Sequence, residues 1–110
     1  MDGILSGVRV MELGQVLAGP FVGAIFADLG AEVTKIERLE GGDDARRMGP
    51  DFRHGDALTF HIMNRGKKSV ALDPMKPEGA AVVRRLVATA DVVIANLPAP
   101  TLKAMQLDYD

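Results

Sequence analysis

The chain has 110 residues, of which 47% are hydrophobic and 25% are charged, a balance typical of one globular domain or part of one. Its formal net charge of −2 argues against a protein that binds nucleic acid through phosphate attraction. There are no cysteines, which excludes disulfides and thiolate metal sites, and His54 and His61 are poorly spaced for a metal, so we expect none.

The first residues lack the basic start and the long apolar run of a signal peptide. No apolar stretch reaches the roughly 18 residues that a membrane span needs, because residues 16–29 are interrupted by Gly19, Pro20, Gly23 and Asp28. We therefore expect a soluble protein of the cytoplasm that does not bind membranes.

The first elements are predicted to be a strand, a helix and a second strand. Residues 8–13 alternate in the manner of a strand, and Pro20 suits the first position of a helix that continues from Phe21 to Leu29. Gly30 suits the end of that helix, and residues 32–37 read as the second strand. The unit has the length of a right-handed parallel crossover.

The second half continues the alternation after a long polar segment at residues 38–55. A short helix is predicted at residues 56–63 with Asp56 as its cap, a third strand at 69–72 and a helix opening at Pro77 and Glu78. The apolar centre of a fourth strand at 91–96 predicts burial on both faces, and residues 101–105 begin another helix. The fold class is α/β, a partial domain with a Rossmann-like parallel sheet and alternating helices.

Parallel sheets of this kind bind ligands at the carboxyl ends of their strands, here residues 14–20, 37–38, 72–75 and 96–100. Residues 16–20 precede a helix whose free amides attract phosphate or carboxylate, and Gly19 would let a ligand approach the backbone. A tight turn without a ligand is an equally good interpretation of that segment.

Several charged residues near these ends have two interpretations each. Glu37 could bind ribose hydroxyls and Arg38 a phosphate, or the two could form a solvated pair. Arg46 and Arg47 could clamp an anion or only solvate the loop. For the basic segment at residues 64–69, an anion contact is favoured slightly over a plain basic turn.

Well-known motifs of other classes fail here. Gly14, Gly19 and Gly23 do not form the dinucleotide fingerprint, and His61 stands where a P-loop needs glycine. No Gly-x-Ser-x-Gly sequence supports a hydrolase triad. The acid pairs, namely Asp43 with Asp44 and Asp108 with Asp110, are expected to be solvated rather than catalytic.

The order of the motifs is more specific than any one of them. They are LSGVRVMEL (5–13), VLAGP (16–20), DLGAEV (28–33), KIER (35–38), GD (42–43), GP (49–50), NRGKKSVALD (64–73), PEG (77–79), ADVVI (90–94) and LDY (107–109), together with Arg46 and Asn96. Over nearly all 110 residues, this order resembles the N-terminal part of the family III CoA-transferases, the group of formyl-CoA transferase, carnitine CoA-transferase and α-methylacyl-CoA racemase.

The resemblance implies that residues 1–110 are the N-terminal portion of a CoA-binding Rossmann-like domain. It implies coenzyme A or acyl-CoA as a substrate rather than a permanently bound cofactor, a carboxylic acid as the other substrate, and an interlocked homodimer. The family's catalytic aspartate lies in a later stretch, so no catalytic residue is expected among these 110.

The resemblance also assigns cofactor-binding positions. Val16, Leu17 and Ala18 would line the thioester end of CoA, and Arg38 would meet a phosphate. Leu72, Asn96 and Leu97 would border the adenosine and pantetheine path, Met75 stands where a CoA-contacting lysine is common, and Met105 would pack nearby.

Four functional hypotheses remain open at this point. The first is transfer of CoA between carboxylic acids through an enzyme-bound acyl carboxylate. The others are an α-methylacyl-CoA racemase type of enzyme, a non-catalytic CoA-binding or assembly module, and a dinucleotide-binding half with Glu37 on a ribose. Leu17 replaces the glutamine of formyl-CoA transferases, which argues against formate or oxalate as the acid.

Overall fold

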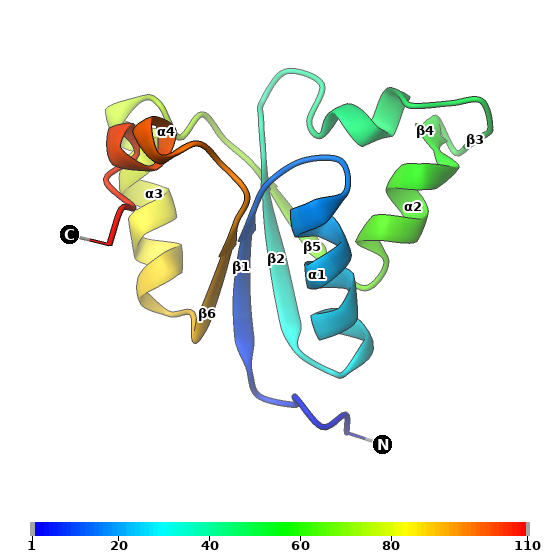
Figure 1. Ribbon diagram of the computed structural model, residues 1–110, viewed down its shortest axis with the longest axis horizontal. Coiled ribbons are helices and arrows are strands. Elements are labelled where there is room, and N and C mark those ends of the chain that lie inside the picture. The colour runs from blue at the N-terminus through cyan, green and yellow to red at the C-terminus, as the bar shows by residue number, and fades with distance from the viewer. Residues whose placement is uncertain (1, 110) are drawn as a thin grey trace.

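The computed structural model describes residues 2–109 and is built around a parallel four-stranded sheet in the order β5–β2–β1–β6 (Figure 1). Its strands are β1 (Arg9–Leu13), β2 (Glu32–Glu37), β5 (Lys68–Ala71) and β6 (Val92–Ala95), and a separate antiparallel pair joins β3 (Phe52–Arg53) to β4 (Asp56–Ala57). The helices are α1 (Ala18–Asp28), α2 (Leu58–Asn64), α3 (Pro77–Ala88) and α4 (Ala99–Ala104), with a 3-10 turn, η1 (Asp44–Arg47). The predicted α/β, Rossmann-like class is confirmed.

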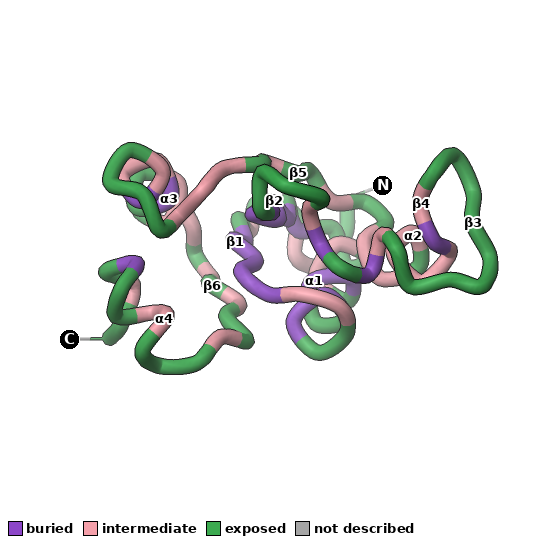
Figure 2. The backbone as a smooth tube through the Cα atoms, turned by 90° about the horizontal axis from the view of Figure 1, so that it is seen from above, coloured by how far each residue is buried: buried purple, intermediate pink, exposed green. Residues whose placement is uncertain are grey.

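Helices cover both faces of the sheet. Figures 1 and 2 place α1 and α2 on one side and α3 with α4 on the other. Alternate side chains of the central strands point to opposite faces. Val10 and Val33 therefore pack on the α1 side, whereas Met11, Leu13 and Ile36 pack with Val83 of α3. Figure 2 shows that buried residues concentrate along β1 and β2.

The first predicted elements lie close to the observed ones. The second strand is found at the predicted residues, and Gly30 ends α1 with φ of +99°, a conformation that glycine adopts without strain. Helix α1 begins at Ala18 rather than at Pro20. Pro20 still lies in the first turn, where a missing N–H leaves no helical hydrogen bond unmade.

Two sequence predictions about the second half are wrong. Asp56 does not cap α2, which begins at Leu58 after Ala57; it lies in β4 and pairs with Arg46 instead. Strand β6 is not buried on both faces, because Val93 is 42% exposed. An apolar strand sequence does not reveal whether a neighbour covers each face.

The last helix, α4, starts at Ala99, two residues before the predicted 101, and Pro100 lies in its first turn.

No helix within residues 2–109 combines the length and the apolarity that crossing a membrane would require.

Candidate functional site

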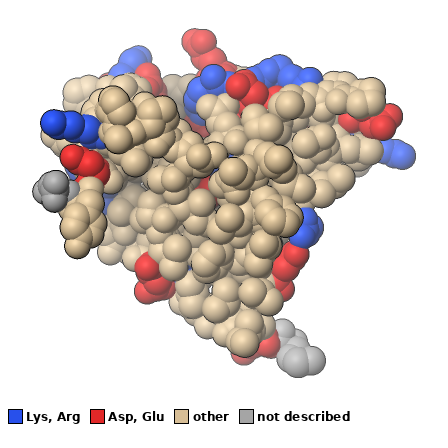
Figure 3. Space-filling view, viewed as in Figure 1, with Lys and Arg blue, Asp and Glu red and all other residues tan. Residues whose placement is uncertain are grey.

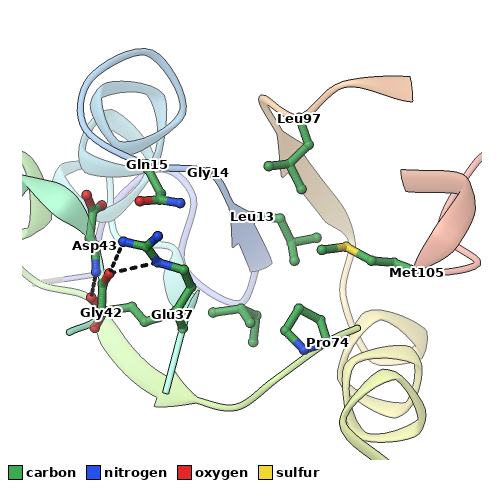
Figure 4. A pocket seen from close by; sticks show the side chains of 11 residues that line it. Leu13, Gly14, Gln15, Glu37, Gly42, Asp43, Pro74, Leu97 and Met105 are labelled. Atoms are coloured by element: carbon green, nitrogen blue, oxygen red, sulfur yellow. Dashed lines mark hydrogen bonds between the residues drawn. The ribbon is translucent and has the colours of Figure 1, made fainter. Parts of the chain in front are cut away.

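The carboxyl edge of the sheet, formed by residues 14–20, 37–44, 72–76 and 96–105, holds a small recess of about 70 Å³ (Figure 4). Its lining comes from six separate stretches of the chain: Leu13, Gly14, Gln15, Ile36, Glu37, Arg38, Gly42, Asp43, Pro74, Leu97 and Met105. In Figure 4, Leu13, Leu97 and Met105 form an apolar wall opposite Gln15 and Asp43. The recess therefore offers an apolar and a polar side to one ligand.

A second recess, of about 410 Å³, adjoins the first along the same edge. It is lined by Arg38, Leu39, Glu40, Leu72, Asp73, Pro74 and Lys76. Arg38 and Pro74 line both recesses. Figure 3 shows basic and acidic side chains gathered along the upper border of the molecule, where Figure 1 has the carboxyl ends of the strands.

The structure brings some of the predicted binding residues together and separates others. Arg38, Leu97 and Met105 line the first recess, and Leu72 lines the second. Met75 lies in the loop before α3 and lines a further hollow together with Lys76 and Ala104. The turn from β1 into α1 contains Val16, Leu17 and Ala18. Asn96 follows β6, and its backbone N–H donates to the Leu13 carbonyl oxygen at 3.1 Å.

Arg38 already has partners within the chain. Its Nε and Nη2 donate to the Gly42 carbonyl oxygen at 3.2 and 3.1 Å, and Nη2 also pairs with Asp44. The side chains of Arg38 and Asp44 are 50% and 53% exposed. An exposed ion pair of this kind contributes only about 0–1 kcal/mol, so an incoming anion can compete for the guanidinium.

Buried charged side chains lie directly beneath this edge. Glu12 on β1 and Lys35 on β2 are register partners, and Lys35 Nζ donates to Glu12 Oε2 at 2.7 Å. The same ammonium lies 2.8 Å from Asp43 Oδ2, and Lys67 Nζ donates to Glu12 Oε1 at 2.6 Å. All four side chains are at most 2% exposed. We call Glu12, Lys35, Asp43 and Lys67 the buried charge cluster.

Asp43 therefore differs from its sequence prediction. It was expected to be solvated next to Asp44, but it is 1% exposed. Its Oδ1 accepts hydrogen bonds from the amides of Val16 at 3.0 Å and Ala45 at 2.9 Å, the second of which caps η1. Its Oδ2 faces Lys35, which also pairs with Glu12, 23 residues earlier in the chain, so only the fold brings the three groups together.

Glu37 also has neither of its predicted roles. It is 5% exposed and is hydrogen-bonded by Arg46, the Ser69 hydroxyl and the Asp43 amide. Burial alone would raise the pKa of Glu37, but these hydrogen bonds and the charge of Arg46 lower it to about 2. Glu37 is thus an internal ion-pair partner rather than a ribose ligand or a solvated acid.

Arg46 is occupied by the same contacts. It reaches Glu37 Oε2 at 2.7 Å and Asp56 Oδ2 at 2.8 Å, and its guanidinium lies 3.8 Å from the centre of the Phe60 ring. This arrangement fastens η1 to β2 and α2, whereas Arg47 pairs at the surface with Asp44. Arg46 therefore organises the loop, an alternative that the sequence did not indicate.

The basic segment at residues 64–69 does not present free cations to an anion. Arg65 pairs with Asp28, Lys67 with Glu12, and Lys68 with Glu32. Burial lowers the pKa of Lys67, while its hydrogen bond and charge contact with Glu12 act in the opposite direction. Lys67 is therefore not available to an anion, whereas an anion contact through the exposed side chains of Arg65 and Lys68 stays a prediction.

The buried charge cluster was not predicted from the sequence, although the sequence contains a signal for it. Glu12 and Lys35 stand in the middle of the two central strands of a parallel sheet, where apolar residues are usual. Each carboxylate of Glu12, Asp43 and Glu37 faces at least one cation. This edge can therefore bind and orient a ligand, but these three acids are not free to act as nucleophile or base.

The profile of CoA-transferase family III matches residues 5–110. The succinate–glutarate CoA-transferase of Agrobacterium fabrum is 52% identical over 112 residues, which cover 96% of this chain and 28% of that protein. The mouse succinyl-CoA:glutarate CoA-transferase is 43% identical over 106 residues, covering 96% of this chain and 24% of the mouse protein.

Solved structures share the fold. A CAIB/BAIF family protein from Brucella suis superposes with a TM-score of 0.91 at 46% identity, over 99% of this chain and 30% of that one. A hypothetical protein from Mycobacterium tuberculosis gives a TM-score of 0.84 at 37% identity, over 99% and 30% of the two chains. The chain thus spans 24–30% of the length of these four proteins.

Proposed function

This chain belongs to CoA-transferase family III, and we propose that it forms the coenzyme A-binding edge of an enzyme that moves CoA between carboxylic acids. The match of the family profile to residues 5–110 carries this proposal. The position of two adjoining recesses at the carboxyl edge supports it, because open parallel sheets bind nucleotide-like ligands there.

Within that function, residues 1–110 would contribute the N-terminal portion of the CoA-binding domain. Arg38 would replace its exposed contact with Asp44 by a CoA phosphate, for which its planar fork of donors is suited. Leu97 and Met105 would pack against the pantetheine arm in the first recess, and Leu72 would border the second.

The reaction itself needs a group that the carboxyl edge does not offer. In CoA transfer an enzyme carboxylate attacks the donor thioester, which releases CoA as its thiolate and leaves the acyl group on the enzyme as a mixed anhydride. The thiolate then attacks the enzyme carbonyl of that anhydride, which frees the donor acid and forms an enzyme–CoA thioester. The acceptor carboxylate repeats the two steps in reverse and leaves with CoA, which regenerates the enzyme carboxylate. Glu12, Asp43 and Glu37 are each neutralised by a buried or half-buried cation, so we assign the acyl-carrying role to none of them.

We further propose that the acids are dicarboxylates and that succinyl-CoA is a donor. The supporting observation is that the relatives at 40–52% identity are named for succinyl-CoA or succinate together with glutarate, citramalate or malate. The resemblance to the family also supports a homodimer in the cytoplasm, which light scattering after gel filtration and cell fractionation would test.

The experiment uses the full-length product of the coding frame that contains these 110 residues. It is incubated with succinyl-CoA and ¹³C-labelled glutarate, and labelled glutaryl-CoA is measured by mass spectrometry, with labelled acetate as a monocarboxylate control. We expect glutaryl-CoA and little acetyl-CoA. If no CoA is exchanged between the acids, and an α-methylacyl-CoA takes up solvent deuterium at its α-carbon, the racemase hypothesis would replace the transferase hypothesis.

A further inference from the structure

The turn from β1 into α1 has a conformation that its sequence does not favour. Val16 has φ of +67°, and the Leu17 amide donates to the Gln15 carbonyl oxygen at 3.0 Å across it. These are the features of a γ-turn with a positive central φ, which is rare and strained. A β-branched residue is a genuine outlier in this region, because its Cβ crowds the backbone.

The buried charge cluster holds the backbone just before this turn and at its central residue. Before the turn, Lys35 Nζ donates to the Gly14 carbonyl oxygen at 3.1 Å. At the turn, the Val16 amide donates to Asp43 Oδ1 at 3.0 Å. Lys35 and Asp43 are themselves in contact at 2.8 Å, so one buried ion pair connects the two hydrogen bonds.

Asp43 is in turn held in place from several sides. Its own amide donates to Glu37 Oε1 at 2.8 Å, and its Oδ1 also accepts from Ala45. Lys35 is fixed by Glu12, which is also bound by Lys67. Strained backbone conformations persist only where the surroundings over-determine them, and such conformations cluster at functional sites.

We propose that Asp43, held by Lys35, is the positioning residue that keeps Val16 in its strained turn, so that residues 16–18 are presented to the thioester end of the acyl-CoA. This inference rests on the proposed CoA transfer. In this role Asp43 acts through Val16 rather than through a contact with the reacting atoms. Its location at the wall of the first recess, which Gly14 and Gln15 also line, places the held turn beside the ligand path.

The mechanism makes a prediction that a purely structural role for Asp43 does not. Without the Asp43 acceptor, Val16 relaxes toward a negative φ and the turn changes direction. Glycine tolerates positive φ without strain, so Val16→Gly allows the turn to keep its shape when the carboxylate is gone. Loss of the counter-ion of Lys35, in contrast, is not relieved by a change at residue 16.

The test compares Asp43→Ala, Val16→Gly and the double variant in the full-length product. Asp28→Ala is the matched control, because it removes an exposed acid that pairs with Arg65 away from the turn. Steady-state kinetics with succinyl-CoA and glutarate give kcat and KM. Hydrogen–deuterium exchange of the peptide spanning residues 14–18 reports the Val16 amide.

For Asp43→Ala we expect faster exchange in that peptide and a kcat lowered about 10- to 100-fold with little change in KM for succinyl-CoA, since the thioester end alone is displaced. The double variant should regain kcat to within about tenfold of the parent protein. Unchanged exchange in Asp43→Ala, or no gain of kcat in the double variant, would overturn the inference.

Two further results keep the inference separate from other failures. A parent protein without CoA transfer contradicts the proposed function, whereas the exchange comparison still decides whether Asp43 holds the turn. If Asp43→Ala does not fold, hydrogen–deuterium exchange of the Val16 amide in the parent protein is the test. Exchange as fast as that of an unprotected amide overturns the inference, and slower exchange supports it.

Discussion

Replacing Glu37 by glutamine tests the energetic role of the ion pairs beneath the carboxyl edge. Glu37 is 5% exposed and bound by Arg46, Ser69 and the Asp43 amide. Glutamine keeps the size of the side chain but cannot carry the charge. We expect Glu37→Gln to be less stable near neutral pH and to lose a defined part of the acid sensitivity of the protein.

The pKa of Glu37 sets the size of this effect. A pKa lowered from the ordinary value of 4.5 to about 2 corresponds to roughly 3 kcal/mol, because one pKa unit is equivalent to about 1.36 kcal/mol. A carboxyl whose folded pKa is below its unfolded pKa stabilises the fold above the unfolded value. That stabilisation is fully present above about pH 4.5 and is lost as the pH falls towards 2.

Two measurements check this prediction. Carbon NMR of the Glu37 carboxyl should give a pKa of about 2, and urea unfolding between pH 6 and pH 2 should show a steeper loss of stability in the parent than in Glu37→Gln. Glu32→Gln is the control on the same strand, because Glu32 pairs with Lys68 at the surface. Equal pH slopes in the parent and Glu37→Gln, or an NMR pKa near 4.5, would refute the reasoning.

Two further substitutions have clear expected outcomes. A Cβ on Gly23 would lie 1.9 Å from Glu12 Oε1, so Gly23→Ala should cost about 1–3 kcal/mol in a urea unfolding experiment. Gly19→Ala on the same helix is the control, because a Cβ there meets only ordinary contacts at 3.6 Å and should be neutral or stabilising. Similar losses of stability in the two variants would contradict the packing argument. Arg38→Ala should weaken CoA binding roughly tenfold by calorimetry, since a charge-assisted hydrogen bond is lost. Replacement of the exposed Arg85 by alanine is the control and should leave the affinity unchanged. Equal affinities of the two variants for CoA would remove Arg38 from the site.

The strands and helices of this chain were largely predictable because the signals for them are local. Residues 32–37 and the helix that opens at Pro77 have the patterning and the boundary residues that their structures require. Asp56 was misassigned because an acid before an apolar run fits a helix cap, and only the fold shows that Arg46 pairs with its carboxylate. The exposure of Val93 on β6 depends on what packs over that face of the sheet, which the strand sequence does not encode.

The candidate site was predictable in its location but not in its electrostatics. The alternation of strands and helices placed the ligand at the carboxyl edge, where the recess with Arg38, Leu97 and Met105 lies. The partners of Lys67 and Lys35 are 55 and 23 residues away in sequence, so their ion pairs could not be read from neighbouring residues. Lys67 therefore looked available for a ligand, although its charge is buried against Glu12.

The central claim is that the carboxyl edge of this sheet binds coenzyme A. Hydrogen–deuterium exchange of the full-length product with and without CoA tests it most directly, with NAD as the competing ligand. We expect CoA to slow exchange in peptides that contain residues 14–18, 38–44 and 96–105, and not in those at the opposite edge around residues 30–32 and 89–91. Protection by NAD but not by CoA, or protection only at the opposite edge, would contradict the claim.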